Sequence, residues 1–141
     1  MNDLPERALS IRQPWAWAIL NAGKRIENRP RRFNYRGPIC LHASLYRPSA
    51  DDQTWFLSTL DDALDPLIEA LWNEWTDAQI INFSLKHRGG IIGTAEIVDC
   101  VETSDDPWFF GPYGLVLENV QPVTFIPVKG ALGLFKWRDR A

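Results

Sequence analysis

Cysteine, histidine and methionine are scarce in this sequence, and their scarcity excludes several kinds of site. The 141 residues include two Cys, two His and one Met. Cys40 and Cys100 each lie in an apolar run without a partner at zinc-ligand spacing, and His42 and His87 lie far apart in the chain. We therefore expect no metal, no cofactor and two small buried cysteines in a reducing, cytoplasmic compartment.

Long hydrophobic runs and several catalytic motifs are also absent. No apolar run approaches the ~20 residues that a membrane-spanning helix needs. The first nine residues, MNDLPERAL, lack the basic-then-apolar order of a secretory signal. The sequence contains no Walker-type phosphate loop and no GxSxG nucleophile motif. We therefore expect no membrane insertion, and neither P-loop nor serine-hydrolase chemistry.

Charge is unevenly distributed along the chain, although the net charge is only −3. Residues 1–50 carry nine basic and three acidic groups, whereas residues 51–80 carry eight acidic groups and no basic one. Six basic residues and one acid lie between Lys24 and Arg36. This pattern indicates a local surface that attracts anions, in a chain that also has a strongly acidic segment.

One helix is clearly marked near the N-terminus. Pro14 is favoured at the first helical position because its missing N–H has no helical partner there. Trp15 and Ile19 begin an apolar stripe at helical spacing. Gly23 occupies the place of a left-handed residue that ends a helix. We therefore expect a helix over residues 14–22.

Short apolar and β-branched runs, separated by Gly and Pro, predict a set of strands. We expect strands over residues 8–11, 26–29, 39–43, 91–101, 115–120, 123–126 and 131–137. Many short strands with Gly and Pro turns favour a small barrel. The predicted fold class is α+β, with a β-barrel of about six strands flanked by helices in a single domain over residues 1–141.

Residues 51–86 have a helical pattern of apolar residues, whereas strands are predicted on both sides of them. Two amphipathic helices are expected here, the first over residues 53–64. The second begins at Asp65-Pro66, an N-cap and N1 pair, and continues to about Phe83. We interpret this segment as an inserted helical lobe that lies apart from the functional site.

Several short motifs taken together resemble one known family. They are SIRQPW at 10–15, Gly23-Lys24, Glu27-Asn28-Arg29, Arg36-Gly37-Pro38, His42-Ala43-Ser44, GGIIG at 89–93, Asp99-Cys100, PWFFGPYG at 107–114 and KGALG at 129–133. With these motifs the chain resembles the ASCH domain, a branch of the PUA-like superfamily. The resemblance covers nearly the whole chain outside about residues 50–86, and it implies a PUA-like barrel.

Three ionisable residues form the centre of the expected site. Lys24 and Glu27 lie three residues apart just beyond the helix. Glu96 interrupts an otherwise apolar strand face, where a carboxylate needs a partner. We expect Glu96 to meet Lys24 across the barrel mouth, either in a structural ion network or in a functional site.

The family resemblance implies a catalytic role for these three residues. Some small bacterial ASCH proteins are amidohydrolases of acetylated cytidine that use a Thr, a Lys and a Glu. Lys24 matches that Lys and Glu96 matches that Glu, whereas Glu27 stands where those enzymes have the Thr.

Polar, basic and aromatic residues around this centre are expected to bind a ligand. Arg12, Lys24, Arg29 and Arg36 would hold phosphate or ribose. Aromatic rings would stack on a base, which contributes ~1–3 kcal/mol per base in other proteins. The complete set of expected binding residues is Ser10, Arg12, Gln13, Pro14, Trp15, Arg29, Arg36, His42, Ser44, Trp108 and Tyr113.

These residues are compatible with functions of more than one class. The first is a binding module for RNA or a nucleoside that takes a cytidine-type base, whose exocyclic amine can donate to a carboxylate. The second is a metal-independent amidohydrolase that removes the acyl group from acylated cytidine. A ribonuclease and a protein-interaction role for the acidic lobe are further alternatives. The missing Thr and the Arg-rich loop favour the binding module, and we expect a monomer.

Overall fold

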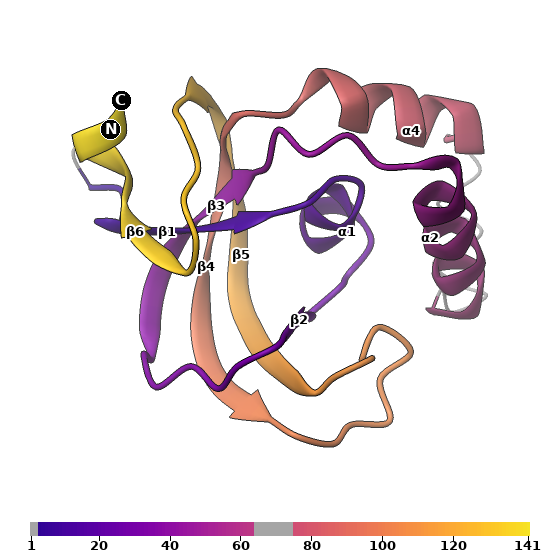
Figure 1. Cartoon of the computed structure of the whole chain (residues 1–141), viewed down its shortest axis with the longest axis horizontal. Helices are drawn as coiled ribbons and strands as arrows, with labels where there is room; N and C mark the ends of the chain where they lie inside the picture. Colours follow the sequence, from indigo (N-terminus) through magenta and orange to yellow (C-terminus); the bar gives the residue numbers. More distant parts are fainter. Residues whose placement is uncertain (1–2, 64–74) are drawn as a thin grey trace.

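A single curled sheet forms the framework of the molecule. The computed structural model describes residues 3–63 and 75–141. Six strands are hydrogen-bonded in the order β2-β5-β4-β3-β1-β6, and the sheet curls into a half-barrel (Figure 1). The strands are β1 (Arg7–Ile11), β2 (Ile26–Arg29), β3 (Gly37–Ala43), β4 (Gly90–Val101), β5 (Tyr113–Pro127) and β6 (Leu134–Lys136). This α+β architecture confirms the predicted fold class and is consistent with a small PUA-like barrel.

The short helix α1 (Trp15–Asn21) confirms the predicted N-terminal helix. Pro14 is its N-cap rather than its first helical residue. Gly23 has a φ of 70°, so the chain leaves the helix through the left-handed residue that the sequence predicts. β1 and β3 are parallel neighbours, and α1 belongs to the connection between them, whereas the other strand pairs are antiparallel.

Two predicted strand boundaries are wrong. The expected strands 115–120 and 123–126 form one continuous strand, β5, that includes Pro122. Pro122 is tolerated because the β4–β5 register shifts near its partner Gly93, and proline is accommodated at such irregular positions. The expected strand 131–137 is shortened to β6, because the chain turns into a 3-10 helix over Trp137–Arg140.

The helical lobe also differs from its prediction. The first helix, α2 (Ala50–Ala63), begins before residue 53 because Ser49 and Asp52 exchange hydrogen bonds of 2.9 and 3.1 Å at its start. The predicted helix start at Asp65-Pro66 lies outside the described residues. A separate helix, α4 (Asp77–Lys86), begins after Thr76, where a capping box with Gln79 interrupts the helix predicted to reach Phe83. No described helix is long and apolar enough to cross a membrane.

Two apolar clusters sit on opposite sides of α1. One fills the concave face of the sheet and includes Ile19 of α1 together with Leu41, Ile97 and Leu117. The other joins α1 to the helical lobe and consists of Trp17, Ala18, Ala22, Ile26, Phe56, Leu60, Ile80 and Trp108. The lobe is therefore packed against α1 through this second cluster, and Figure 1 shows α2 on the far side of α1 from β3 and β4.

We predict that Phe56→Ala lowers the free energy of unfolding by ~3–5 kcal/mol, because it leaves a cavity at a fully buried aromatic side chain. Phe56 lies 5.7 Å from Trp15, 6.3 Å from Trp17 and 5.7 Å from Trp108 between ring centroids. Urea unfolding measures the change. The neighbouring Trp55→Ala, at a side chain that is 48% exposed, is the control and should cost much less. Equal costs would show that the lobe does not rest on Phe56.

Candidate functional site

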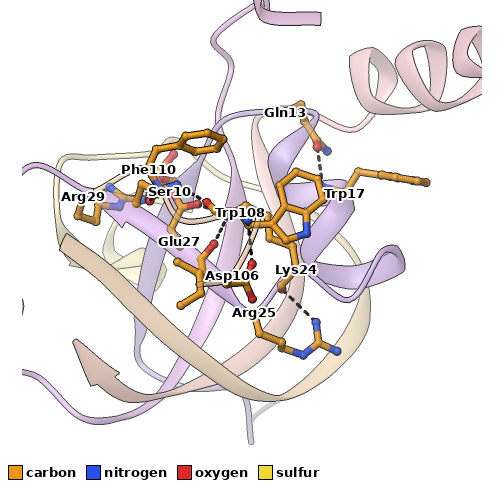
Figure 2. Close-up of polar contacts among 12 residues, drawn as sticks. Ser10, Gln13, Trp17, Lys24, Arg25, Glu27, Arg29, Asp106, Trp108 and Phe110 are labelled. Atoms are coloured by element: carbon orange, nitrogen blue, oxygen red, sulfur yellow. Dashed lines mark hydrogen bonds and ion pairs between the residues drawn. The ribbon is translucent and has the colours of Figure 1, made fainter. Parts of the chain in front are cut away.

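A chain of charged groups connects the end of α1 to β2 and β1. The Nζ of Lys24 lies 2.9 Å from Oε1 of Glu27, and Nη2 of Arg29 lies 3.2 Å from Oε2 of the same carboxylate. The same Nη2 donates to the carbonyl oxygen of Ser10 at 2.8 Å. Figure 2 shows Glu27 and Arg29 beside Ser10. Each oxygen of the Glu27 carboxylate is thus held by its own cation.

Lys24 is placed by the turn that ends α1. Its backbone N–H donates to the carbonyl of Ala18 at 3.2 Å, directly after the left-handed Gly23. The side chain is completely buried, and its ammonium also donates to the carbonyl of Ile26. A buried ammonium is tolerated only with such partners. Lys24 therefore fixes the Glu27 carboxylate through a buried ion pair, and it does not line the cavity that Glu27 faces.

Glu27 faces a cavity of about 420 Å³, which we call the base cavity. Its side chain lines this cavity and is 12% exposed, so a small group inside the cavity can contact part of it. The lining residues come from β1, α1, β2, α2 and the loop before β5: Ser10, Ile11, Arg12, Trp15, Glu27, Asn28, Arg29, Pro30, Asp52, Trp55 and Phe110.

Three aromatic rings form one wall of the base cavity. The ring centroid of Trp55 lies 5.9 Å from Trp15 and 4.8 Å from Phe110. Trp55 and Phe110 are 48% and 47% exposed, which is unusual for large apolar side chains. These two rings therefore leave part of their surface available for a flat ligand.

Asn28 positions the loop that carries Phe110. Its Nδ2 donates to the carbonyl of Trp108 at 2.9 Å, and its Oδ1 accepts from the N–H groups of Phe110 at 2.8 Å and Gly111 at 3.0 Å. The neighbour of Glu27 and Arg29 on β2 thus fixes the aromatic wall opposite them. One four-residue strand sets both the charged and the apolar parts of the cavity.

Asp52 adds a second carboxylate to the cavity lining. The N–H of Ser49 and then the hydroxyl of Tyr46 hold the pKa of Asp52 below its ordinary value, through hydrogen bonds of 2.9 and 2.8 Å. Arg12 lies over the Tyr46 ring, 3.9 Å from its centroid. This carboxylate is engaged with its own helix start, whereas Glu27 faces the cavity between two cations.

A second cavity of about 600 Å³ lies beside the first, around His42. Nε2 of this buried ring lies 2.7 Å from the carbonyl oxygen of Val128, which can only accept, so Nε2 carries a proton. Burial lowers the pKa of His42, so the ring is neutral at pH 7. Nδ1 therefore accepts from the hydroxyl of Ser10 at 2.9 Å.

Three of the predicted binding residues have structural roles instead. Gln13 is fully buried; its Oε1 accepts from the N–H of Trp17 at 2.8 Å, and its Nε2 donates to the carbonyl of His87 at 3.0 Å. Pro14 is buried at the start of α1. Trp108 is only 3% exposed and packs in the cluster between α1 and the lobe.

Four further predicted residues lie outside the base cavity. Arg36 is exposed at the start of β3, where it donates to the carbonyls of Phe33 and Tyr35 and lies 3.9 Å from Asp99. Tyr113 packs beneath the guanidinium of Arg32. His42 and Ser44 line the second cavity. The residues that reach the base cavity are Ser10, Arg12, Trp15, Glu27 and Arg29.

The predicted pairing of Lys24 with Glu96 is wrong. Among the described residues, the ion pair of Lys24 is formed with Glu27. Glu96 is half-buried on β4, opposite Glu118 of β5 and Pro38 of β3. Its neighbours Ala95 and Ile97 point into the barrel core, so alternation along the strand directs Glu96 to the other face.

The helical lobe contributes to the base cavity, contrary to its predicted position apart from the site. Asp52 and Trp55 of α2 both line the cavity. No sequence signal points to them, because the docking of α2 onto α1 is a tertiary contact. Phe110 lies in the PWFFGPYG motif, whose aromatic residues are stacking candidates from the sequence, although the expected binding set contains only Trp108 and Tyr113 from this motif.

We predict that Lys24→Met lowers the free energy of unfolding by ~3–5 kcal/mol, because it leaves the Glu27 carboxylate without its buried partner. Chemical denaturation measures the loss. The control is Arg36→Met, which removes an exposed cation whose carboxylate partner is 3.9 Å away, and should cost ~0–1 kcal/mol. A Lys24→Met protein as stable as wild type would contradict a structural role for the pair.

His42 predicts a loss of stability on acidification. The pKa of His42 in the folded state lies below the ordinary value of 6.5. On acidification the unfolded chain therefore binds a proton at a higher pH than the folded chain does. The contribution of the neutral His42 ring to the free energy of unfolding is fully present above pH 6.5. It declines as the pH falls through and below that value. Thermal melts across this range should show a decline that His42→Gln reduces and His87→Gln leaves in place.

An NMR titration of the His42 ring in the folded protein provides an independent check. Its midpoint should lie below that of an unfolded histidine. A midpoint at or above pH 6.5 would contradict the neutral ring and the direction of the Ser10 hydrogen bond.

Comparison with known proteins identifies the family to which this chain belongs. The family model of the ASCH domain matches residues 9–110, which run from within β1 to Phe110 and include β2, β3, β4 and the helical lobe. A search of curated proteins finds no match to this chain. In the described ranges 3–63 and 75–141, no three His, Cys, Asp or Glu side chains are grouped so that they could hold a metal ion. The chain belongs to the ASCH domain family, whose members are generally thought to bind RNA.

Proposed function

We propose that this protein binds single-stranded RNA by taking one cytosine-type base into the base cavity. The observation that carries this proposal is the Glu27 carboxylate, held by Lys24 and Arg29 and facing a cavity with an aromatic wall. A fixed acceptor beside flat apolar surfaces is the combination that reads the edge of an unpaired base.

The Glu27 carboxylate favours a base with an exocyclic amine. Each of its oxygens accepts one hydrogen bond from a cation, and a carboxylate oxygen has a second lone pair for a ligand. Cytosine presents its N4 amine as a donor, whereas uracil presents an oxygen at the same position, which a carboxylate repels. Because Lys24 and Arg29 hold the carboxylate in place, it cannot turn away from the wrong base.

The aromatic wall supplies affinity rather than selectivity. Every base has a π-face, and stacking on an aromatic side chain contributes ~1–3 kcal/mol per base. Trp55 and Phe110 each expose about half of their surface and line the cavity, so a base can stack there without displacing the core. A base can enter only if it is unpaired, which is why the proposed target is a single strand.

An amidohydrolase of acylated cytidine is the alternative, and the position of Glu27 favours it over other reactions. A carboxylate beside a bound acylated amine can act as a base on an attacking water. Lys24 is buried behind Glu27 and would act only by positioning it. Ribonuclease activity is a further alternative, which the shortening of a bound oligonucleotide would reveal.

We predict that the wild-type protein binds cytidine more tightly than uridine by ~1–3 kcal/mol, because only cytidine has an exocyclic amine to donate to Glu27. Glu27→Gln should remove most of this preference, since an amide can both donate and accept. Isothermal titration with both nucleosides measures it. Glu96→Gln is the matched control: it makes the same chemical change on another strand, outside the base cavity, and should keep the preference.

Equal binding of cytidine and uridine by the wild-type protein would contradict the proposed reading of the base. Loss of the preference in Glu96→Gln but not in Glu27→Gln would move the site to the other face of β4. Incubation with N4-acetylcytidine separates binding from hydrolysis: release of cytidine that Glu27→Gln abolishes would favour the amidohydrolase, and an unchanged ligand favours the binding module.

A further inference from the structure

We propose that the cavity around His42 is an anion subsite for the phosphate of the nucleotide whose base occupies the base cavity. The proposal rests on the proposed function and deepens it, because it locates the residues that would contact the phosphate of the bound nucleotide. We call this second cavity the phosphate cavity.

The charged residues that line the phosphate cavity are all basic. Arg12, Arg29, Lys129 and Arg140 contribute to it, and none of its described lining residues is an Asp or a Glu. His42 is neutral and satisfied by its two hydrogen bonds, so the positive charge comes from these four side chains. In an acidic protein with a net charge of −3, such a concentration of cations favours the binding of an anion.

Most of these cations remain available for a ligand. Within the described ranges 3–63 and 75–141, Arg12, Lys129 and Arg140 form no ion pair with a carboxylate. Arg140 uses its Nε to donate to the carbonyl of Lys129 at 3.2 Å, which holds the two residues together. The Nε of Arg29 is buried and has no hydrogen-bond partner in the described part of the chain. Leaving this donor without an acceptor costs free energy in the ligand-free protein.

The two cavities share a wall, which makes one ligand able to occupy both. Ser10, Arg12 and Arg29 line the base cavity and the phosphate cavity alike. The guanidinium of Arg29 is fixed at this boundary by the carbonyl of Ser10 and by Glu27. A nucleotide with its base against Glu27 would therefore present its phosphate to the arginines at the boundary.

The backbone of the loop that contains Lys129 packs closely against His42 and Ser10, which line the phosphate cavity. A Cβ on Gly130 would come within 2.8 Å of Cε1 of His42 and 3.0 Å of Oγ of Ser10, so only glycine allows this approach. The loop and Arg140 both follow residue 110, beyond the part of the chain that the family model matches. The phosphate cavity is thus completed by the C-terminal segment.

Titration of two ligands against three proteins tests the subsite. Cytidine and cytidine 5′-monophosphate are titrated into wild type, a Lys129→Gln/Arg140→Gln variant and Lys86→Gln, which removes a cation of α4 outside both cavities. Wild type should bind the monophosphate about tenfold or more tightly than cytidine at low salt, because charge-assisted hydrogen bonds are added. The double variant should bind the monophosphate only as tightly as cytidine. Its affinity for cytidine should equal that of the wild-type protein. Lys86→Gln should change neither affinity.

Salt dependence and strand length give a second measurement. For a short oligocytidylate, the slope of log K against log salt should become shallower by roughly 0.7 for each phosphate that the double variant no longer neutralises. A slope and affinity that stay at the wild-type values would overturn the subsite. Equal binding of cytidine and its monophosphate by the wild-type protein would overturn it as well.

Failure of the subsite is distinguishable from failure of the proposed base reading. If wild type binds inorganic phosphate and binds the monophosphate more tightly than cytidine, and the double variant loses both properties, the subsite stands even when cytidine and uridine bind equally. If cytidine is preferred over uridine but inorganic phosphate does not perturb the NMR signals of Lys129 and Arg140, the base site stands and the subsite falls.

Discussion

The buried ion pair between Lys24 and Glu27 is the interaction on which the candidate site depends. An ammonium without water must find acceptors, and Lys24 finds them in the carbonyl of Ile26 and in the carboxylate. That requirement fixes the turn after α1 against β2, and the second oxygen of Glu27 then aligns Arg29 with β1. The polar groups are oriented before any ligand arrives, which limits the entropy lost on binding.

The aromatic wall depends in turn on how the helical lobe is attached. Phe56 of α2 and Trp17 of α1 pack in one cluster with Trp108, and this packing brings Trp55 to the edge of the base cavity. Asn28 holds the loop with Phe110 from the opposite side. The lobe that interrupts the barrel in sequence therefore completes the cavity in space.

The sequence correctly predicts those features of the site that depend on residues close together in the chain. Pro14 and Gly23 mark the limits of α1, and the alternation of β2 places Glu27 and Arg29 on one side. The failures at the candidate site concern long-range interactions. Alternation shows that Glu96 shares a face with particular neighbours, yet only the curled sheet shows which face is inside. The lining by Trp55 could not be predicted, because nothing in α2 specifies its docking partner.

The balance of charge around Glu27 restricts which ligands the base cavity can accept. Two cations share this single carboxylate, so the group carries a local surplus of one positive charge even though its accessible atoms are acceptors. A neutral amine can donate to such a group without electrostatic cost, whereas a ligand with its own positive charge is repelled. If the base cavity takes a cytosine as proposed, a cytosine protonated or alkylated at its ring nitrogen would therefore bind less well than the neutral base.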